Sequence, residues 1–271
     1  MPELPEVETT RRGIAPHLVG RRIRALLVHE PRLRWPIDPE LPRVLPGQRV
    51  LAVTRRAKYL LLTLTRGALI LHLGMSGSLR IVAQHSARSR HDHFELVLDS
   101  GQVLRFNDPR RFGCCLHTLT DPLAHPLLAH LAPEPLLAGF DGEYLHRVTR
   151  RRRVAIKPLL LNGQLVTGVG NIYASEALFR ARIRPRRAAR SLDRAECSRL
   201  AAAIRRVLSA AIRSGGTTLR DYVDAEGMPG EFRQKLYVYE RAGRPCRRCR
   251  TPVRQVQQGQ RSTYFCPQCQ S

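Results

Sequence analysis

The first residues of the chain, Met-Pro-Glu-Leu-Pro-Glu, contain two groups that could do chemistry together. Once the initiator methionine is removed, Pro2 becomes the N-terminus and its nitrogen is a secondary amine. An α-amino group titrates at about 7.7–8.0, so roughly 10–20% of it is neutral and nucleophilic at pH 7. Glu3 follows directly and could serve as a general acid or base. The alternative is purely structural, with Pro5 near the first turn of a helix.

Four of the seven cysteines form two Cys-x-x-Cys pairs near the C-terminus, with 16 residues between the pairs. Two such pairs supply the four thiolates of a tetrahedral zinc site, so we expect one structural Zn²⁺ ion held by Cys246, Cys249, Cys266 and Cys269. Between the pairs, residues 253–257 and 261–265 alternate around Gly259 and predict a β-hairpin with the metal at its base. A basic hairpin of this kind either contacts nucleic acid or only stabilises the fold, and the metal site alone does not decide between the two.

A glycine-rich segment from Thr167 to Asn171 precedes a predicted helix. Free N–H groups at a helix start bind phosphate oxygens, and Asn171 is the expected cap of this helix. No strand precedes the segment, so a dinucleotide-binding fold is not predicted. A simple turn between two helices explains the same residues.

Three short clusters in the first half of the chain could contact DNA bases or phosphates. Lys58 lies in a basic run that enters an apolar strand, Met75 lies at a turn between glycines, and Arg110 and Phe112 follow an Asp-Pro turn. An exposed methionine, arginine and phenylalanine together could wedge into a base stack. The structural alternatives are a solvated strand end and a core methionine.

The charge of the chain indicates a polyanionic partner. The sequence has 46 basic and 22 acidic residues, a net charge of +24 and a pI of about 11.3. Nucleic acid is the most common partner of such a chain, and an anionic membrane surface is the second possibility. No apolar run approaches the roughly 18 residues of a membrane span, so we expect no spanning helix. No long basic amphipathic segment stands apart from the rest of the fold, so we also expect no membrane partner. Only three basic residues are lysine, which marks Lys58, Lys157 and Lys235 as positions that could need a compact ammonium group.

The elements that position these groups change in type along the chain. Up to about residue 120, short β-rich runs about ten residues apart, separated by turn signals, predict an antiparallel sandwich or barrel. A short helix is expected over 5–15, ending near Pro16, and the clearest amphipathic helix over 192–213. We therefore expect an α+β protein divided into a β-sandwich at 1–120, a proline-containing linker at 121–142, a helical domain at 143–235 and a zinc hairpin at 236–271.

Together these motifs resemble the bacterial formamidopyrimidine-DNA glycosylase family, and the resemblance extends over essentially the whole chain. It includes the Pro-Glu-Leu-Pro-Glu start, the Lys58 run, the Met75 turn, His91-Asp-His93, Asp108 to Gly113, Gly168 to Glu176 and the zinc cysteines. The resemblance implies an N-terminal antiparallel β-sandwich, a C-terminal helical domain with a helix–two-turns–helix element and a zinc β-hairpin, and DNA bound in the cleft between them.

The activity implied by the resemblance is bifunctional base-excision repair. The family excises 8-oxoguanine and formamidopyrimidines from duplex DNA through an iminium on Pro2, then cuts the abasic site by β,δ-elimination. Glu3 is implied as the acid–base group, with Lys58 and Arg261 assisting elimination. The other implied DNA contacts are Met75, His91, Arg110, Phe112, Arg152 and Asn171. A segment near 216–230 is implied to cover the flipped base.

Two alternatives remain open at this stage. The sister family, endonuclease VIII, shares the architecture but prefers oxidised pyrimidines, although Leu4 and the Met75, Arg110 and Phe112 set favour the purine branch. A zinc-ribbon protein that binds DNA or RNA without catalysis would explain charge and cysteines but not the Pro2-Glu3 start. We expect a monomer that acts on damaged double-stranded DNA in the bacterial cytoplasm, close to the nucleoid.

Overall fold

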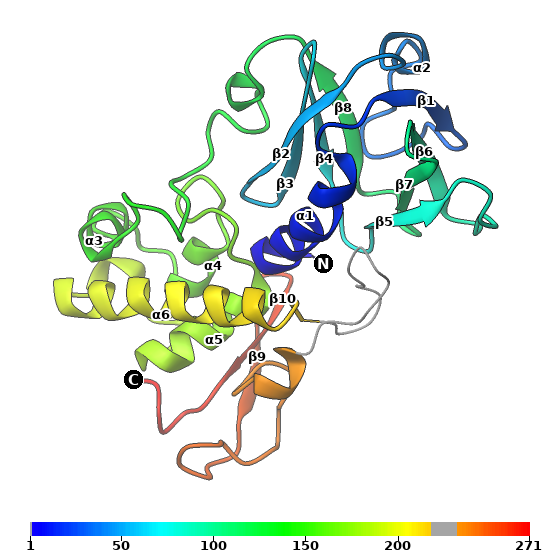
Figure 1. Cartoon of the computed structure of the whole chain (residues 1–271). Helices are drawn as coiled ribbons and strands as arrows, with labels where there is room; N and C mark the ends of the chain where they lie inside the picture. The colour runs from blue at the N-terminus through cyan, green and yellow to red at the C-terminus, as the bar shows by residue number, and fades with distance from the viewer. Residues whose placement is uncertain (1, 218–231) are drawn as a thin grey trace. The chain divides into compact units, whose positions relative to one another are not determined.

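The structure is a computed structural model of the 271-residue chain that describes residues 2–217 and 232–271 (Figure 1). The chain divides into two compact units. The first extends to Ala129 and includes the segment that begins at Ser214, and the second comprises His130–Arg213 and Phe232–Ser271. The division after Ala129 falls inside the segment 121–142, for which a linker is expected.

The first unit is built on two antiparallel four-stranded sheets. Their orders are β1-β6-β7-β5 and β2-β3-β4-β8. The strands are β1 (Ile23–Val28), β2 (Val50–Arg56), β3 (Tyr59–Leu64), β4 (Ala68–His72), β5 (Ser78–Ala83), β6 (Asp92–Leu98), β7 (Gln102–Asn107) and β8 (Cys114–Thr118). Leucines of both sheets meet in one hydrophobic core, with Leu62 and Leu71 from one sheet and Leu96 and Leu104 from the other. The predicted β-sandwich is therefore confirmed.

Helix α1 (Leu4–Leu18) packs on this core and places the N-terminus at the sandwich. Its inward side chains Val7, Ile14 and Leu18 belong to the same hydrophobic cluster as the strands. The helix expected over 5–15 is confirmed, and it extends two residues beyond Pro16, which lies inside its last turn. Leu18, two residues later, is fully buried. The free energy gained by its burial offsets the loss of the backbone hydrogen bond that Pro16 cannot donate.

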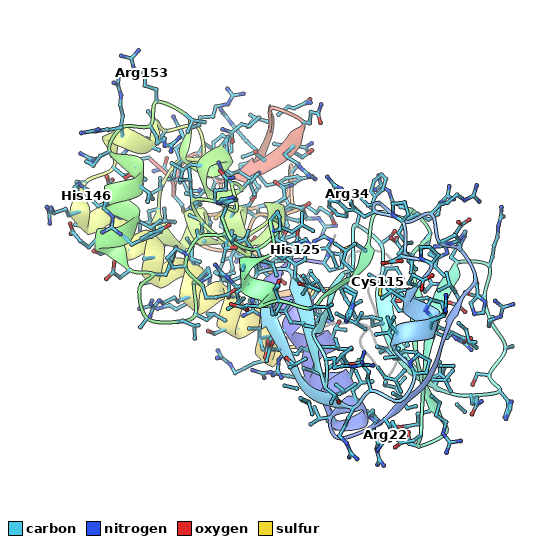
Figure 2. All side chains as sticks on the ribbon, turned by 90° about the horizontal axis from the view of Figure 1, so that it is seen from above. Arg22, Arg34, Cys115, His125, His146 and Arg153 are labelled. Atoms are coloured by element: carbon cyan, nitrogen blue, oxygen red, sulfur yellow. The ribbon has the colours of Figure 1, made fainter. Side chains whose placement is uncertain are left out.

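Two short helices complete the described elements of this unit, α2 (Leu41–Val44) and the 3-10 helix η1 (Pro122–Ala124). Cys114 and Cys115 are buried, as expected of core residues, and Figure 2 marks Cys115 within this unit. Burial raises the pKa of the Cys114 thiol to about 12, which keeps it protonated and unreactive.

The second unit is mainly helical up to Arg213. Its helices are α3 (Gly142–Thr149), α4 (Ile156–Leu160), α5 (Asn171–Ala181) and α6 (Arg194–Arg213), with a 3-10 turn η2 (Ala189–Ser191). The apolar stripe of α6 is buried as its periodicity predicts, and it includes Cys197, Leu200, Ile204 and Leu208. Helix α5 is buried on nearly every side between its neighbours.

A zinc-type hairpin follows the helices in the same unit. After the 3-10 turn η3 (Phe232–Lys235), strands β9 (Arg254–Gln258) and β10 (Arg261–Phe265) pair antiparallel, with Arg261 opposite Gln258. Gly259 has φ +58° in the two-residue connection, a left-handed conformation that glycine adopts without a steric cost. The predicted α+β class, with its sandwich, helical domain and hairpin, is thus confirmed.

One predicted boundary differs from the structure. The helical domain was expected to reach residue 235, yet Ser214–Thr217 belong to the first unit. The physical reason is a hydrogen bond of 2.8 Å from the Thr217 backbone N–H to the buried carboxylate of Glu6 in α1. The covering segment implied at 216–230 lies almost wholly outside the described residues.

Candidate active site, nucleic-acid contacts and zinc centre

The start of helix α1 holds the two groups expected to react. Pro2 and Glu3 are buried, and Glu3 is the extended N-cap residue of the helix. The backbone N–H of Glu3 donates to Glu6 Oε2 at 2.8 Å, while Glu6 Oε1 accepts the N–H of Thr217. Glu6 therefore fixes the backbone directly after Pro2 to the helix and to a chain segment more than 200 residues away. Sequence reasoning gave Glu6 no role of its own.

Lys58 lies in the tight turn between β2 and β3. Ala57 adopts φ +55° there, and its carbonyl accepts a hydrogen bond of 2.8 Å from Arg55 Nη1. Lys58 is half-buried. Burial first, and then the charges of Lys58 and Arg34, lower the pKa of His72 to about 4. His72 is therefore neutral at pH 7, and its Nδ1 accepts the Gly74 N–H at 2.9 Å.

The predicted wedge residues come from two loops that one buried carboxylate joins. Asp108 is fully buried, its Oδ1 accepts the Ser76 hydroxyl at 2.7 Å, and its Oδ2 accepts the Gly113 N–H at 2.9 Å. Gly74 has φ +63°, and a Cβ there would stand 2.5 Å from the Gly113 nitrogen, so the two loops pack directly together. Asp108 thus brings the Met75 turn beside the loop of Arg110 and Phe112.

The wedge side chains themselves are only partly covered. Phe112 is 43% exposed, and the Arg110 guanidinium lies 4.9 Å from its ring centroid. Met75 is half-buried rather than fully exposed. An exposed aromatic ring with a stacked guanidinium is a surface suited to contact with bases.

His91 lies on the rim of a polar cavity in the first unit. The cavity has a volume of about 710 Å³, and its lining includes His29, three arginines (Arg88, Arg90 and Arg111) and two carboxylates, Glu30 and Asp92. The His91 carbonyl accepts the Asp108 N–H at 3.0 Å, which places His91 beside the wedge loop. These cationic and imidazole groups are suited to phosphate oxygens.

In the second unit, Asn171 and Arg261 are brought together by the hairpin. Asn171 Nδ2 donates to the carbonyl of Ser262 at 3.1 Å, and Arg261 is the exposed residue next to it. The expected capping role of Asn171 is wrong, because Gly170 occupies the N-cap in an extended conformation and Asn171 is the first helical residue. The carbonyl oxygen of the Asn171 side chain is buried without a partner among the described residues.

A residue that sequence reasoning noted but did not place lies in the same cluster. Lys157 in α4 is 1% exposed, and its Nζ donates to the Ser262 carbonyl at 3.0 Å and to Thr263 Oγ1 at 2.7 Å. Lys157 and Asn171 therefore share one carbonyl and hold the start of β10, which carries Arg261. The scarcity of lysine in the chain was the available signal.

The arginine run after α3 contains residues with different roles. Arg150 Nη2 donates to the carbonyls of Arg190 and Leu192 and so supports the fold. Arg152 is exposed, and Figure 2 shows the neighbouring Arg153 pointing away from the ribbon. Of the expected DNA contacts in this run, Arg152 is therefore sterically accessible.

The four cysteines of the two knuckles form the predicted zinc site. Their Sγ atoms all lie within 4.8 Å of one another, with 3.4 Å between Cys249 and Cys266 and 4.0 Å between Cys246 and Cys269. A tetrahedral site with Zn–S bonds of about 2.3 Å separates its sulfurs by about 3.8 Å. The donor set and spacing fit one structural zinc ion, which has no open position for substrate.

The zinc segment is tied to helix α5 by a buried carboxylate. Glu176 Oε2 accepts the Tyr237 N–H at 2.9 Å, and Oε1 accepts the Val238 and Tyr239 N–H groups at 2.9 and 3.0 Å. Complete burial raises the pKa of Glu176, although these three donors favour its ionised form.

Among the helices that the structure describes, none is long and apolar enough to cross a membrane.

A buried Pro-Glu start on a β-sandwich, a helical unit and a four-cysteine zinc hairpin define a class of DNA-repair glycosylases. Matches to family models extend over the chain: the formamidopyrimidine-DNA glycosylase N-terminal domain at residues 1–115, the H2TH domain at 131–223, and a zinc finger found in FPG and IleRS at 243–271. The chain belongs to the formamidopyrimidine-DNA glycosylase family and is an enzyme of that DNA-repair class.

Two bacterial relatives match this chain over its full length. Formamidopyrimidine-DNA glycosylases of Thioalkalivibrio sulfidiphilus and Stutzerimonas stutzeri are 58% and 55% identical over 270 residues, with 100% of each chain covered. The crystal structure of MutM (FPG) from Thermus thermophilus matches with a TM-score of 0.89 and 42% identity, covering 99% of this chain and 98% of that one. A Lactococcus lactis FPG mutant in complex with Fapy-dG-containing DNA matches with a TM-score of 0.93 and 34% identity over 100% of both chains.

Proposed function

We propose that this enzyme excises oxidised purines, chiefly 8-oxoguanine and formamidopyrimidines, from double-stranded DNA and then cleaves the strand by β- and δ-elimination. The observation that carries the proposal is the Pro2-Glu3 start, held in place before α1 by Glu6. Family membership supports it, as does a relative that is described in complex with a formamidopyrimidine lesion in DNA. Removal of Met1 is required, since an amide nitrogen is not a nucleophile.

Pro2 lies directly before Glu3, the N-cap residue of α1, so an amine freed at Pro2 would stand at the start of this helix. Glu3 is the adjacent carboxyl group and is buried beside it.

In the proposed reaction the Pro2 nitrogen attacks C1′ of the damaged nucleotide, and the bond from C1′ to the base breaks. Glu3 protonates the sugar ring oxygen, and the ring opens to an iminium on Pro2. This cationic electron sink acidifies the C2′ hydrogen, so the 3′ phosphate leaves by β-elimination. A further proton loss expels the 5′ phosphate by δ-elimination, and hydrolysis of the iminium frees Pro2.

The base must leave the duplex before C1′ is reached, and unstacking costs a few kcal/mol. We assign Met75, Arg110 and Phe112 to the vacated space, which they would fill while holding the partner base. The shared carboxylate of Asp108 and the cation–π pair of Arg110 with Phe112 support this assignment, because they keep the two loops in one arrangement.

The phosphates flanking the lesion are assigned to groups of both units. These are Lys58, His91, Arg152, Asn171 and Arg261. A guanidinium stays protonated at any working pH, so Arg261 would stabilise the leaving phosphate electrostatically rather than donate a proton.

The experiment that tests the mechanism is borohydride trapping on duplexes that carry 8-oxoguanine opposite cytosine. Protein with a free Pro2 should give a covalent adduct that peptide mapping places on Pro2. Protein with an N-terminal extension should give none, whereas Lys58→Arg and Lys157→Arg should still be trapped. An adduct on a lysine, or trapping of the extended protein, would overturn the Pro2 mechanism.

A second arm of the same experiment tests the lesion class. Duplexes with an oxidised pyrimidine should be trapped far more slowly than the oxidised-purine duplex, and the reverse order would place the enzyme with the pyrimidine-specific branch. We also propose that the enzyme acts as a monomer, which light scattering with and without a duplex checks. A stable dimer at working concentration would contradict this.

A further inference from the structure

The second unit contains a basic groove. Its lining includes none of the residues assigned above to DNA or zinc. It lies where the C-terminal part of α5, the middle of α6 and the zinc knuckle meet, and its volume is about 530 Å³. Five arginines converge on it from these three elements: Arg180, Arg199, Arg206, Arg247 and Arg248. We call it the arginine groove. No carboxylate is among the residues that line it.

The charges in the arginine groove lack close carboxylate partners among the described residues. Arg180, Arg206, Arg247 and Arg248 form no ion pair within 4.0 Å with any described carboxylate, and the side chains of these four make no hydrogen bond to described residues. Arg199 reaches only Glu196, at 3.9 Å. Some arginines elsewhere in the described residues are paired closely, as Arg187 is with Glu196. Five converging guanidinium groups, four of them with no described carboxylate within 4.0 Å, favour an anionic ligand.

The floor of the arginine groove is rigid and partly apolar. Phe179 belongs to the core cluster around the zinc cysteines, and Tyr237 is held by the hydrogen bond from its N–H to Glu176. Ala202 and Ala203 of α6 line the same floor. A half-buried apolar floor under a rim of arginines can accept one apolar side chain between several acidic ones.

The aromatic ring in the groove is not available to a nucleobase. Tyr237 stacks with Phe179 at a centroid distance of 5.3 Å, and Arg180 and Arg247 lie over the Tyr237 ring at 5.1 and 5.9 Å. Single-stranded nucleic acid binds through bases stacked on open aromatic faces, and duplex DNA presents its phosphates on a convex surface. Carboxylates and phosphates both match the fork geometry of arginine. Of the two, carboxylates on a peptide segment are carried by a chain thin enough to enter a hollow.

We propose that the arginine groove is a docking site for an acidic peptide segment of a partner protein, in which several Asp or Glu residues flank one apolar side chain. The carboxylates pair with the arginines of the rim, and the apolar side chain rests on the alanines of α6. The groove would thereby connect this repair enzyme to another protein while its DNA-contacting residues stay available. This inference does not depend on the Pro2 mechanism.

The test measures fluorescence anisotropy of a labelled twelve-residue peptide, rich in Asp and Glu with a central Phe, titrated with the zinc-loaded full-length protein. The groove variant is R180S/R206S. The matched control is R24S/R186S, which removes two exposed arginines that have no ion pair among the described residues and lie outside the groove. Zinc content and circular dichroism confirm that both variants are folded.

The groove variant should bind the peptide at least about tenfold more weakly, as the loss of two charge-assisted contacts predicts, and the control less than about twofold. A peptide with Asn and Gln in place of its acids should not bind, and replacement of its Phe by Ser should weaken binding. Affinity for an undamaged duplex and borohydride trapping should be equal in the two variants.

Two results would overturn the proposal. Equal losses of peptide affinity in both variants would mean that only net charge is sensed. A loss of duplex affinity in the groove variant as large as its loss of peptide affinity would make the groove a nucleic-acid surface. A failed trapping reaction with intact peptide binding would instead count against the Pro2 mechanism alone.

Discussion

Glu6 in the first unit and Glu176 in the second are buried glutamates whose carboxylates bind backbone N–H groups, yet the two are used differently. Glu6 divides its oxygens between its own helix start and Thr217, 211 residues further along the chain. Glu176 places both oxygens on one continuous stretch, Tyr237 to Tyr239, just before the first zinc knuckle. A buried carboxylate of this kind satisfies donors that irregular backbone could not otherwise pair.

The two sets of partners show which backbone segment each glutamate keeps in place. Glu6 immobilises the backbone next to a proposed nucleophile, so its loss should affect the reaction more than the fold. Glu176 anchors a zinc segment that has few strands of its own, so its loss should affect the fold more than the reaction.

Removal of zinc should have the largest effect and should be confined to the second unit. Zinc binding contributes apparent free energies of about 10–16 kcal/mol to the folding of small zinc-finger domains. We expect chelation to abolish hydrogen-exchange protection in β9 and β10 while strands β2–β4 keep theirs, since leucines of the sandwich core need no ion. Retained protection of the hairpin after verified zinc loss would show that helix contacts alone hold it.

Replacement of Glu176 by Ala should come next. The change leaves three backbone N–H groups, one buried and two partly buried, without their acceptor, and we expect a loss of about 3–5 kcal/mol in the unfolding free energy of the second unit. Urea unfolding followed by circular dichroism, together with the rate of zinc release, measures it. Glu143→Ala is the matched control in the same unit, because its side chain is 57% exposed and its ion pair with Arg194 is a surface pair. Similar losses in both variants would refute the anchoring role.

Replacement of Glu6 by Gln should separate reaction from stability. An amide retains one acceptor, so we expect a loss of only about 1–2 kcal/mol in stability. Trapping with borohydride should nevertheless slow by about 10–100-fold, because small displacements of a reacting group are costly. Glu40→Gln, whose side chain is 59% exposed, serves as the control. A stability loss without a rate effect would make Glu6 an anchor of the same kind as Glu176.

The contrast between the glutamates also explains which features could be predicted from the sequence. The Cys-x-x-Cys pairs, the hairpin between them and the Pro2-Glu3 start are encoded within a few residues, and the structure brings the cysteines together as expected. The strand spacing and the apolar stripe of α6 are periodic signals of the same local kind. Such signals need no knowledge of how distant segments meet.

The features that could not be predicted depend on distant segments. Asp108 joins the Met75 turn to the Phe112 loop, and Lys157 meets the hairpin across more than 100 residues. No spacing rule encodes those contacts, because each depends on the packed sandwich or on the helices. The capping prediction for Asn171 failed for a local reason instead: Gly170 adopts the extended N-cap conformation, and Asn171 is thereby shifted into the helix.

Within helix α1, Glu8 is paired with arginine side chains rather than with backbone N–H groups. Its replacement should have the smallest effect of the changes considered. Burial opposes ionisation of Glu8, but hydrogen bonds from Arg11 and Arg12 and the charge of Arg55 outweigh it and lower the pKa to about 2 from 4.5. Between these two pH values the unfolded chain binds a proton that the folded chain does not. The stabilisation is therefore complete above pH 4.5 and is lost as the pH falls toward 2.

Glu8→Gln should remove this acid-side dependence. We expect the variant to be about 1–2 kcal/mol less stable than the parent near neutral pH, a value that allows for solvent screening of a half-buried group. The difference should shrink steadily between pH 4.5 and 2, as followed by urea unfolding at each pH, while Glu40→Gln shows no such trend. Trapping rates at neutral pH should stay unchanged, because the Glu8 carboxylate holds arginine side chains and leaves the Glu3 backbone to Glu6. A slowed trapping reaction would instead show that the charge of the whole helix, rather than the backbone tie through Glu6, positions the reactive end.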